Sequence, residues 1–106
     1  MIIRVDIDET ICYTPYVYDE NGNKQRDYYN SSPYKQNITK INAAYDAGNT
    51  IIYWTSRGSR TKLDWRELTE RQLAHWGAKY HELHLDKPYY DLIIDDKAIE
   101  DRKSVV

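Results

Sequence analysis

The sequence predicts an α/β fold with a parallel sheet, and three observations support this. Short runs rich in β-branched and apolar residues, typical of strands, alternate with longer segments of helical periodicity. Glycines stand where the two clearest helices should end, and the chain contains no internal repeat or low-complexity tract. Strands separated by helices favour parallel pairing with right-handed crossovers.

The length and charge of the chain limit what it can be. Its 106 residues suffice for one domain, 1–106, and for no second domain. Hydrophobic residues make up 41% and charged residues 30%, as in folded soluble proteins. The 15 basic and 17 acidic side chains nearly cancel, which argues against a surface built for a nucleic-acid backbone or an anionic membrane.

The cysteine count and the apolar runs indicate a cellular compartment. Cys12 is the single cysteine, so an internal disulfide is excluded and a reducing environment is favoured. No apolar run approaches the ~20 residues needed to span a bilayer. The charged N-terminus does not resemble a signal peptide, so we expect a cytoplasmic protein without membrane association.

The first strand is expected at residues 2–7, and a β-hairpin excursion follows it at residues 13–34, here called the flap. The flap is polar and centred on Asn21-Gly22, a turn signal, and its expected strands are 16–18 and 26–29. The chain has 11 tyrosines and no phenylalanine, and six of the tyrosines cluster here. Because tyrosine keeps a polar end, the cluster suggests an interface or a substrate contact, and a half-buried hairpin is the simpler alternative. Its members are Tyr13, Tyr16, Tyr18, Tyr28, Tyr29 and Tyr34.

The first helix has clear boundary signals in the sequence. Ser32 can cap it, Pro33 suits the first helical position, and Gly48 suits its end. Between these residues one apolar stripe follows helical spacing: Ile38, Ile41, Ala44 and Tyr45.

The second half of the chain repeats the strand–helix pattern. A strand is expected over the apolar run 50–54, ending at Thr55, then a loop at 56–61, and a second helix at 62–76 that ends at Gly77. A short strand is expected at 80–85, and a last one at 92–94.

Polar side chains follow every predicted strand. In an open parallel sheet, ligands bind in the crevice beyond the carboxyl ends of the strands, so these groups should converge. Each has an ordinary structural explanation as a turn residue, a helix cap or a solvated loop charge, but those explanations do not account for all of them together. The groups are Asp6 and Asp8, Thr55, Lys87, and the pair Asp95-Asp96.

These residue types suit phosphoryl transfer. Several carboxylates around one crevice need a compensating cation, and oxygen ligands without a His or Cys cluster favour Mg²⁺ over Zn²⁺. One carboxylate can then attack phosphorus and form an aspartyl-phosphate. A second carboxylate two residues along a strand points to the same side, where it can protonate the leaving oxygen and activate water. A Thr hydroxyl and a Lys ammonium offset the charge that develops on the transferred oxygens.

The same residues resemble the haloacid dehalogenase superfamily of phosphohydrolases. Residues 5–11, Val-Asp-Ile-Asp-Glu-Thr-Ile, resemble its first motif, hydrophobic-Asp-X-Asp-X-Thr. Residues 51–58 resemble its second motif, Lys87 matches the lysine of the third, and residues 93–96 are similar to the fourth. The resemblance covers essentially the whole chain, in the family's order.

The resemblance implies a role for each matching residue. Asp6 would be the nucleophile and a metal ligand. Asp8 would be the general acid and base, and would also ligate the metal through its backbone carbonyl; its presence favours phosphatase over dehalogenase chemistry. Thr55 would bind the phosphoryl group, and Lys87 would complete the catalytic set.

Further residues are implicated less directly. Asp95 would be a metal ligand, with Asp96 as a second or water-mediated one. Ser56 and Arg57 follow the phosphoryl-binding threonine and are candidates for substrate binding, although a surface charge is an equal alternative for the arginine. Glu9 departs from the family, since many members have glycine there, in a tight turn.

The resemblance also implies an architecture and a substrate class. The expected fold is a three-layer α/β/α, Rossmann-like sheet with the flap and no cap domain, because neither insertion point has room for a cap. Such a chain is similar to small members associated with capsule and surface-polysaccharide synthesis. We expect a small phosphorylated metabolite, such as a sugar phosphate, as substrate. Capless relatives often close their sites with a neighbouring subunit, so a homo-oligomer, dimer or tetramer, is expected.

Three other functions remain open. A nucleic-acid end phosphatase would share these motifs, although the chain lacks a basic stripe. A receiver-like signalling domain also uses Asp, Thr and Lys around Mg²⁺, but it places the phosphoacceptor at the end of a middle strand. A catalytically inactive binding module would not need the full set of acidic residues.

Overall fold

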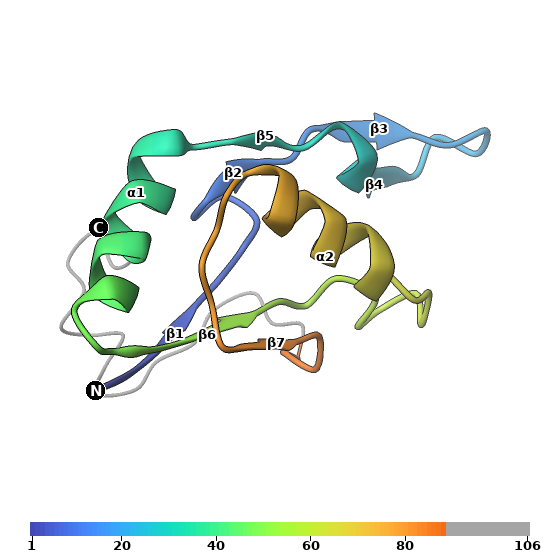
Figure 1. Ribbon diagram of the computed structural model, residues 1–106. Coiled ribbons are helices and arrows are strands. Elements are labelled where there is room, and N and C mark those ends of the chain that lie inside the picture. The colour runs from blue at the N-terminus through green and yellow to red at the C-terminus, as the bar shows by residue number, and fades with distance from the viewer. Residues whose placement is uncertain (89–106) are drawn as a thin grey trace, which may run out of the picture.

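The centre of the molecule is a three-stranded parallel sheet in the order β1-β6-β7 (Figure 1). The computed structural model describes residues 1–88. Strand β1 spans Ile2–Val5, β6 spans Thr50–Trp54 and β7 spans Glu82–His84. Ile3 is in register with Ile51, and Tyr53 is in register with Leu83. The predicted α/β class with a parallel sheet is thus confirmed.

Both crossovers between these strands carry a helix on the same side of the sheet (Figure 1). Helix α1 spans Lys35–Asp46 and α2 spans Arg66–His75. The strand order advances in one direction, and right-handed crossovers then place both helices on one face. Residues 1–88 therefore form one helical layer on the sheet, with no cap domain among them. The expected strand at 92–94 lies outside the described residues.

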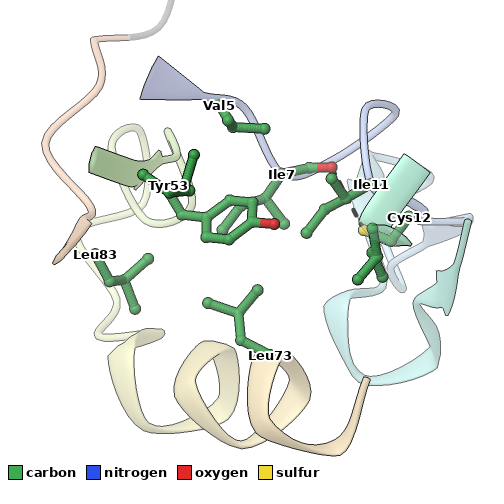
Figure 2. Packing of buried hydrophobic residues seen from close by; sticks show 9 residues of the cluster. Val5, Ile7, Ile11, Cys12, Tyr53, Leu73 and Leu83 are labelled. Atoms are coloured by element: carbon green, nitrogen blue, oxygen red, sulfur yellow. Dashed lines mark hydrogen bonds between the residues drawn. The ribbon is translucent and has the colours of Figure 1, made fainter. Parts of the chain in front are cut away.

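The hydrophobic core fills the space between the sheet and the two helices (Figure 2). Ile51 and Tyr53 of β6 are fully buried there, since alternate residues of a strand share a face. Ile38 comes from α1 and Leu73 from α2. Burying each such side chain contributes about 1.5–3 kcal/mol, which fixes the helices on the sheet. The other members are Val5, Ile7, Ile11, Cys12 and Leu83.

Tyr53 places a phenol hydroxyl in this core, and within residues 1–88 that hydroxyl has no hydrogen-bond partner. Figure 2 shows its ring among the labelled apolar side chains. Burial raises the pKa of Tyr53 from its ordinary value of 10.0 to about 12. Because the phenol ionises less readily in the folded chain, its titration leaves the free energy of unfolding unchanged below the unfolded pKa and lowers it as pH rises from that value to the folded pKa.

Tyr53→Phe is therefore expected to raise the free energy of unfolding by about 1 kcal/mol at neutral pH, because it removes a buried unpaired polar group. The advantage over the natural chain should grow between pH 10 and 12, where only the natural chain loses stability through this phenol. Urea unfolding at neutral pH and between pH 10 and 12 measures the difference in the free energy of unfolding. Tyr18→Phe is the control, since Tyr18 is 69% exposed. A less stable Tyr53→Phe chain would contradict an unpaired hydroxyl.

The start of the first helix differs from the prediction. Ser32 does not cap the helix, and Pro33 is not its first residue: Ser32–Pro33 forms the short strand β5, antiparallel to β2 at Cys12–Tyr13. The helix begins two residues later, at Lys35, because the backbone of the preceding segment is held by the first loop. The Tyr34 amide donates to the Ile11 carbonyl at 2.8 Å. Its predicted end is confirmed, with Gly48 at a φ of 98°.

The second helix also begins later than predicted. Lys62 has a φ of 65°, which a right-handed α-helix does not accommodate. The helix starts at Arg66, whose amide donates to Asp64 Oδ1 at 3.0 Å. The predicted end at Gly77 is confirmed by its φ of 72°. The first strand ends at Val5 rather than at Ile7.

The flap is a hairpin that projects from the body of the molecule (Figure 1). Strand β3, Tyr16–Tyr18, has the predicted bounds, and it pairs antiparallel with β4, which spans Lys24–Arg26 rather than the predicted 26–29. Asp19 closes the turn by accepting the Asn21 and Asn23 amides at 2.9 and 2.8 Å. The expected continuation of the second strand is instead the 3-10 helix η1, Tyr28–Asn30. In the described part of the chain, both α-helices are too short to cross a membrane.

Candidate active site

The carboxyl ends of all three parallel strands meet at one place. Asp6 follows β1, and its Oδ2 lies 3.1 Å from the Nζ of Lys87, which follows β7. The Lys87 amide donates to the Thr55 carbonyl at 3.2 Å, and the Thr55 amide donates to the His84 carbonyl at 2.9 Å. Ser59 Oγ donates to the Lys87 carbonyl at 2.7 Å and fixes this segment. The structure thus brings together Asp6, Thr55 and Lys87, as the strand ends predict.

Asp6 and Thr55 differ in their exposure. The Asp6 side chain is 40% exposed, and its Oδ1 accepts the Ile7 amide at 2.9 Å. Thr55 is buried, and its Oγ1 accepts the Arg57 amide at 3.2 Å. Because that hydroxyl accepts a bond here, its own proton remains available for donation to a further oxygen. Ser56 is half-buried in the turn that follows, and its carbonyl accepts the Ser59 amide at 2.9 Å.

Asp8 is held by Arg57 through two parallel hydrogen bonds. Arg57 Nε donates to Asp8 Oδ2 at 3.1 Å, and Nη2 donates to Oδ1 at 2.9 Å. Asp8 Oδ1 also accepts from Thr14 Oγ1 at 2.6 Å. Paired bonds between a guanidinium and a carboxylate fix both position and orientation. Arg57, predicted as a substrate contact or a surface charge, is 1% exposed and faces Asp8.

The loop after β1 is joined to the base of the flap. Glu9 has a φ of 65° and adopts the left-handed conformation that glycine accepts most easily. Its Oε1 accepts the Thr14 amide at 3.1 Å and Arg26 Nη1 at 2.8 Å. The Glu9 side chain therefore joins the first loop to strand β4, which a glycine at this position could not do.

Two ionisable groups near Asp8, the Cys12 thiol and the Tyr28 phenol, are held in their neutral forms by burial and by the Asp8 carboxylate. Burial raises the pKa of the Cys12 thiol to about 11, with Asp8 as the next cause. The pKa of Tyr28 is raised by the same two causes in the same order. The thiol of Cys12 therefore stays protonated at neutral pH, which agrees with a packing role.

The predicted metal ligands lie only partly within the described chain. Asp95 and Asp96 fall outside residues 1–88, and within those residues no group of three or more His, Cys, Asp or Glu side chains could hold a metal. The exposed carboxylate of Asp6 is an oxygen donor of the kind Mg²⁺ prefers. The Asp8 carboxylate is engaged by Arg57, which leaves its backbone carbonyl as the donor that the family resemblance implies.

Several residues of this site were not predicted from the sequence. Thr14 and Ser31 share a hydrogen bond of 2.7 Å between their hydroxyls, beside Asp8. Thr69 and Gln72 of α2 accept from Arg57 Nη1 at 3.1 and 2.6 Å. Because Thr69 and Gln72 are three residues apart, both lie on one face of the helix. A polar pair next to the buried Leu73 was the sequence signal that could have identified them. No comparable signal identifies Thr14.

A comparison with solved structures supports the architecture. A crystal structure of a structural-genomics target from Vibrio cholerae superposes with a TM-score of 0.72 and 24% sequence identity, covering 92% of this chain and 80% of that one. The two chains share a fold. No protein-family model and no curated protein matches the sequence.

Proposed function

We propose that this protein is a Mg²⁺-dependent phosphomonoester hydrolase that acts through an aspartyl-phosphate on a small phosphorylated metabolite. The observation that carries the proposal is the meeting of Asp6, Thr55 and Lys87 at the strand ends, with Asp8 fixed two residues from Asp6. By its resemblance to small capless phosphohydrolases, we further propose a sugar phosphate of polysaccharide synthesis as substrate.

In the first step, an Asp6 carboxylate oxygen attacks phosphorus, and the bond from phosphorus to the leaving oxygen breaks. The carboxylate is exposed enough for this attack and is oriented by the Ile7 amide and by Lys87. The Thr55 hydroxyl donates to a phosphoryl oxygen, and the Lys87 ammonium offsets the developing charge. The Lys87 ammonium beside Asp6, and the bond from the Lys87 amide to the Thr55 carbonyl, support these roles.

Asp8 moves the proton in both halves of the reaction. It gives a proton to the leaving oxygen in the first step. In the second step it takes a proton from the water that attacks phosphorus, the bond from phosphorus to the Asp6 oxygen breaks, and inorganic phosphate leaves. Its side chain is 16% exposed, so part of it stays accessible while its other contacts hold it.

A bound Mg²⁺ would neutralise the charge of an approaching phosphate dianion. Asp6 would hold it with the Asp8 carbonyl, and with Asp95 and Asp96 outside the described residues. The donors are all oxygens, as this ion requires.

Hydrolysis of an aryl phosphate with excess Mg²⁺ tests the proposal, and EDTA is expected to abolish the rate because the attacking carboxylate would then repel the phosphate. Added Mg²⁺ should restore it. Phosphate release is then measured over sugar phosphates, nucleotides, phospho-acids and 3′-phosphorylated oligonucleotides. Undiminished hydrolysis in EDTA would refute the metal, and a sole preference for oligonucleotides would favour the end-phosphatase alternative. Stable phosphorylation by acetyl phosphate without turnover would favour a receiver-like domain.

A further inference from the structure

We infer that Arg57 is a positioning residue, which holds the Asp8 carboxylate so that one of its two oxygens, Oδ2, exchanges the proton with substrate and water. The inference rests on the proposed function, in which Asp8 is the general acid and base. The sequence suggested that Arg57 binds substrate directly. The inference gives it an indirect role instead, through Asp8.

Arg57 is the largest fully buried side chain among residues 1–88, and each of its donor groups is occupied. A guanidinium carries five N–H donors. Nε and Nη2 donate to Asp8, Nη1 donates to Thr69 and to Gln72, and Nη2 also donates to Ser31 Oγ at 3.3 Å. A phosphate could take these donors only if a buried charge lost its partners, which is strongly unfavourable.

The face of the guanidinium is fixed as well. The Tyr28 ring lies under it, with 4.7 Å between the Arg57 Cζ and the ring centroid. Gln72 Nε2 donates to the Tyr28 carbonyl at 2.6 Å, so helix α2 holds both the guanidinium and the residue that stacks on it. Hydrogen bonds thus restrain the edges of the Arg57 guanidinium, and the Tyr28 ring restrains its face. The fixed guanidinium in turn fixes the orientation of the Asp8 carboxylate.

The two oxygens of Asp8 are left in different states. Oδ1 accepts from Arg57 Nη2 at 2.9 Å, from Thr14 Oγ1 at 2.6 Å and from Cys12 Sγ at 3.7 Å, which leaves it no free lone pair. Among residues 1–88, Oδ2 accepts from Arg57 Nε alone, at 3.1 Å. One lone pair of Oδ2 is therefore left by these residues, and it is where the transferred proton resides.

The test is the dependence of kcat/KM on the leaving group in Arg57→Lys. Lysine keeps the charge but cannot make two parallel bonds, so the carboxylate loses its orientation. For an alkyl phosphate, whose leaving oxygen needs a proton, we expect kcat/KM to fall about 10²-fold. For 2,4-dinitrophenyl phosphate, which leaves without one, we expect a fall of less than about 5-fold, with KM little changed. Asp8→Asn should show the same contrast, and the double variant should lose no more than Asp8→Asn alone.

A matched control is Arg26→Lys, because Arg26 also pairs with a carboxylate of the first loop, that of Glu9. It should leave both substrates unaffected. If Arg57→Lys does not fold, Thr69→Val loosens the guanidinium by removing one acceptor, and a smaller loss with the same leaving-group contrast is expected. Equal losses for both substrates, in either variant, would overturn the inference.

A second readout separates this inference from the proposed function. The Arg57 Nε–H resonance, assigned by its disappearance in Arg57→Lys, should exchange slowly with solvent and should shift in Asp8→Asn but not in Asp6→Asn. If no phosphomonoester is hydrolysed, the proposed function fails, and this resonance still reports on the pairing. Exchange as fast as that of exposed arginines would overturn the positioning role whatever the activity.

Discussion

Asp6→Asn is expected to lower phosphomonoester hydrolysis by about 10⁴-fold, because an amide oxygen of the same shape is a poor nucleophile. The fold should survive the change. The Asp6 carboxylate is 40% exposed, and the amide oxygen of asparagine can still accept from Lys87, whose side chain is 12% exposed, so the change should cost no more than about 1–3 kcal/mol. Steady-state kinetics with an aryl phosphate measures the first effect, and thermal unfolding measures the second.

The matched control for this variant is Asp46→Asn. Asp46→Asn also removes a carboxylate that pairs with a lysine, Lys79 at 2.9 Å, but Asp46 lies at the end of α1. Its rate should equal that of the natural chain. Equal rates for Asp6→Asn and Asp46→Asn would show that Asp6 is not the nucleophile.

Gly58→Ala is expected to lower the free energy of unfolding by about 3 kcal/mol, for two reasons that add. Gly58 has a φ of 83°, in the left-handed region that L side chains rarely adopt. A Cβ at this position would also collide with the Leu63 carbonyl oxygen and lie 3.2 Å from Cδ1 of Trp65. Urea unfolding measures the loss of stability. A lower rate of phosphomonoester hydrolysis is expected as well, because Gly58 directly follows Arg57.

Gly22→Ala separates the two reasons. Gly22 has nearly the same φ, 80°, but a Cβ there meets nothing within 4 Å. We expect it to cost about 1 kcal/mol, the backbone contribution alone. If both glycine variants lose the same amount, the loop around Leu63 relaxes and close packing is not what requires glycine at position 58.

The strands were more predictable than the helix starts. The run Thr50–Trp54 is a strand that ends one residue before the predicted Thr55, and it was predictable because its β-branched and aromatic residues carry the signal themselves. Ser32 and Pro33 satisfy every local rule for a helix start, yet they pair with Cys12–Tyr13. That partner is twenty residues earlier in the chain, and a local rule does not include it. Lys62 likewise enters a left-handed turn that its residue type does not suggest.

The candidate site shows the same division. Asp6, Thr55 and Lys87 could be placed together because each follows a strand, and parallel strands bring their carboxyl ends to one edge. The burial of Arg57 could not be predicted, since a charge after a strand is ordinarily solvated. Its acceptor Asp8 lies 49 residues away, a separation that no spacing rule covers. Asp95 and Asp96 remain predictions.

The pairing of β1 with β6 sets the order in which this protein can mature during synthesis. Ile2 pairs with Thr50, so the first strand leaves the ribosome long before its neighbour exists. Lys87 follows later still, and until then the Asp6 carboxylate has no cation beside it. Non-local pairings of this kind slow folding, because the chain loses entropy before the contacts form. A nascent chain therefore completes this candidate site late, after the framework that carries it has closed.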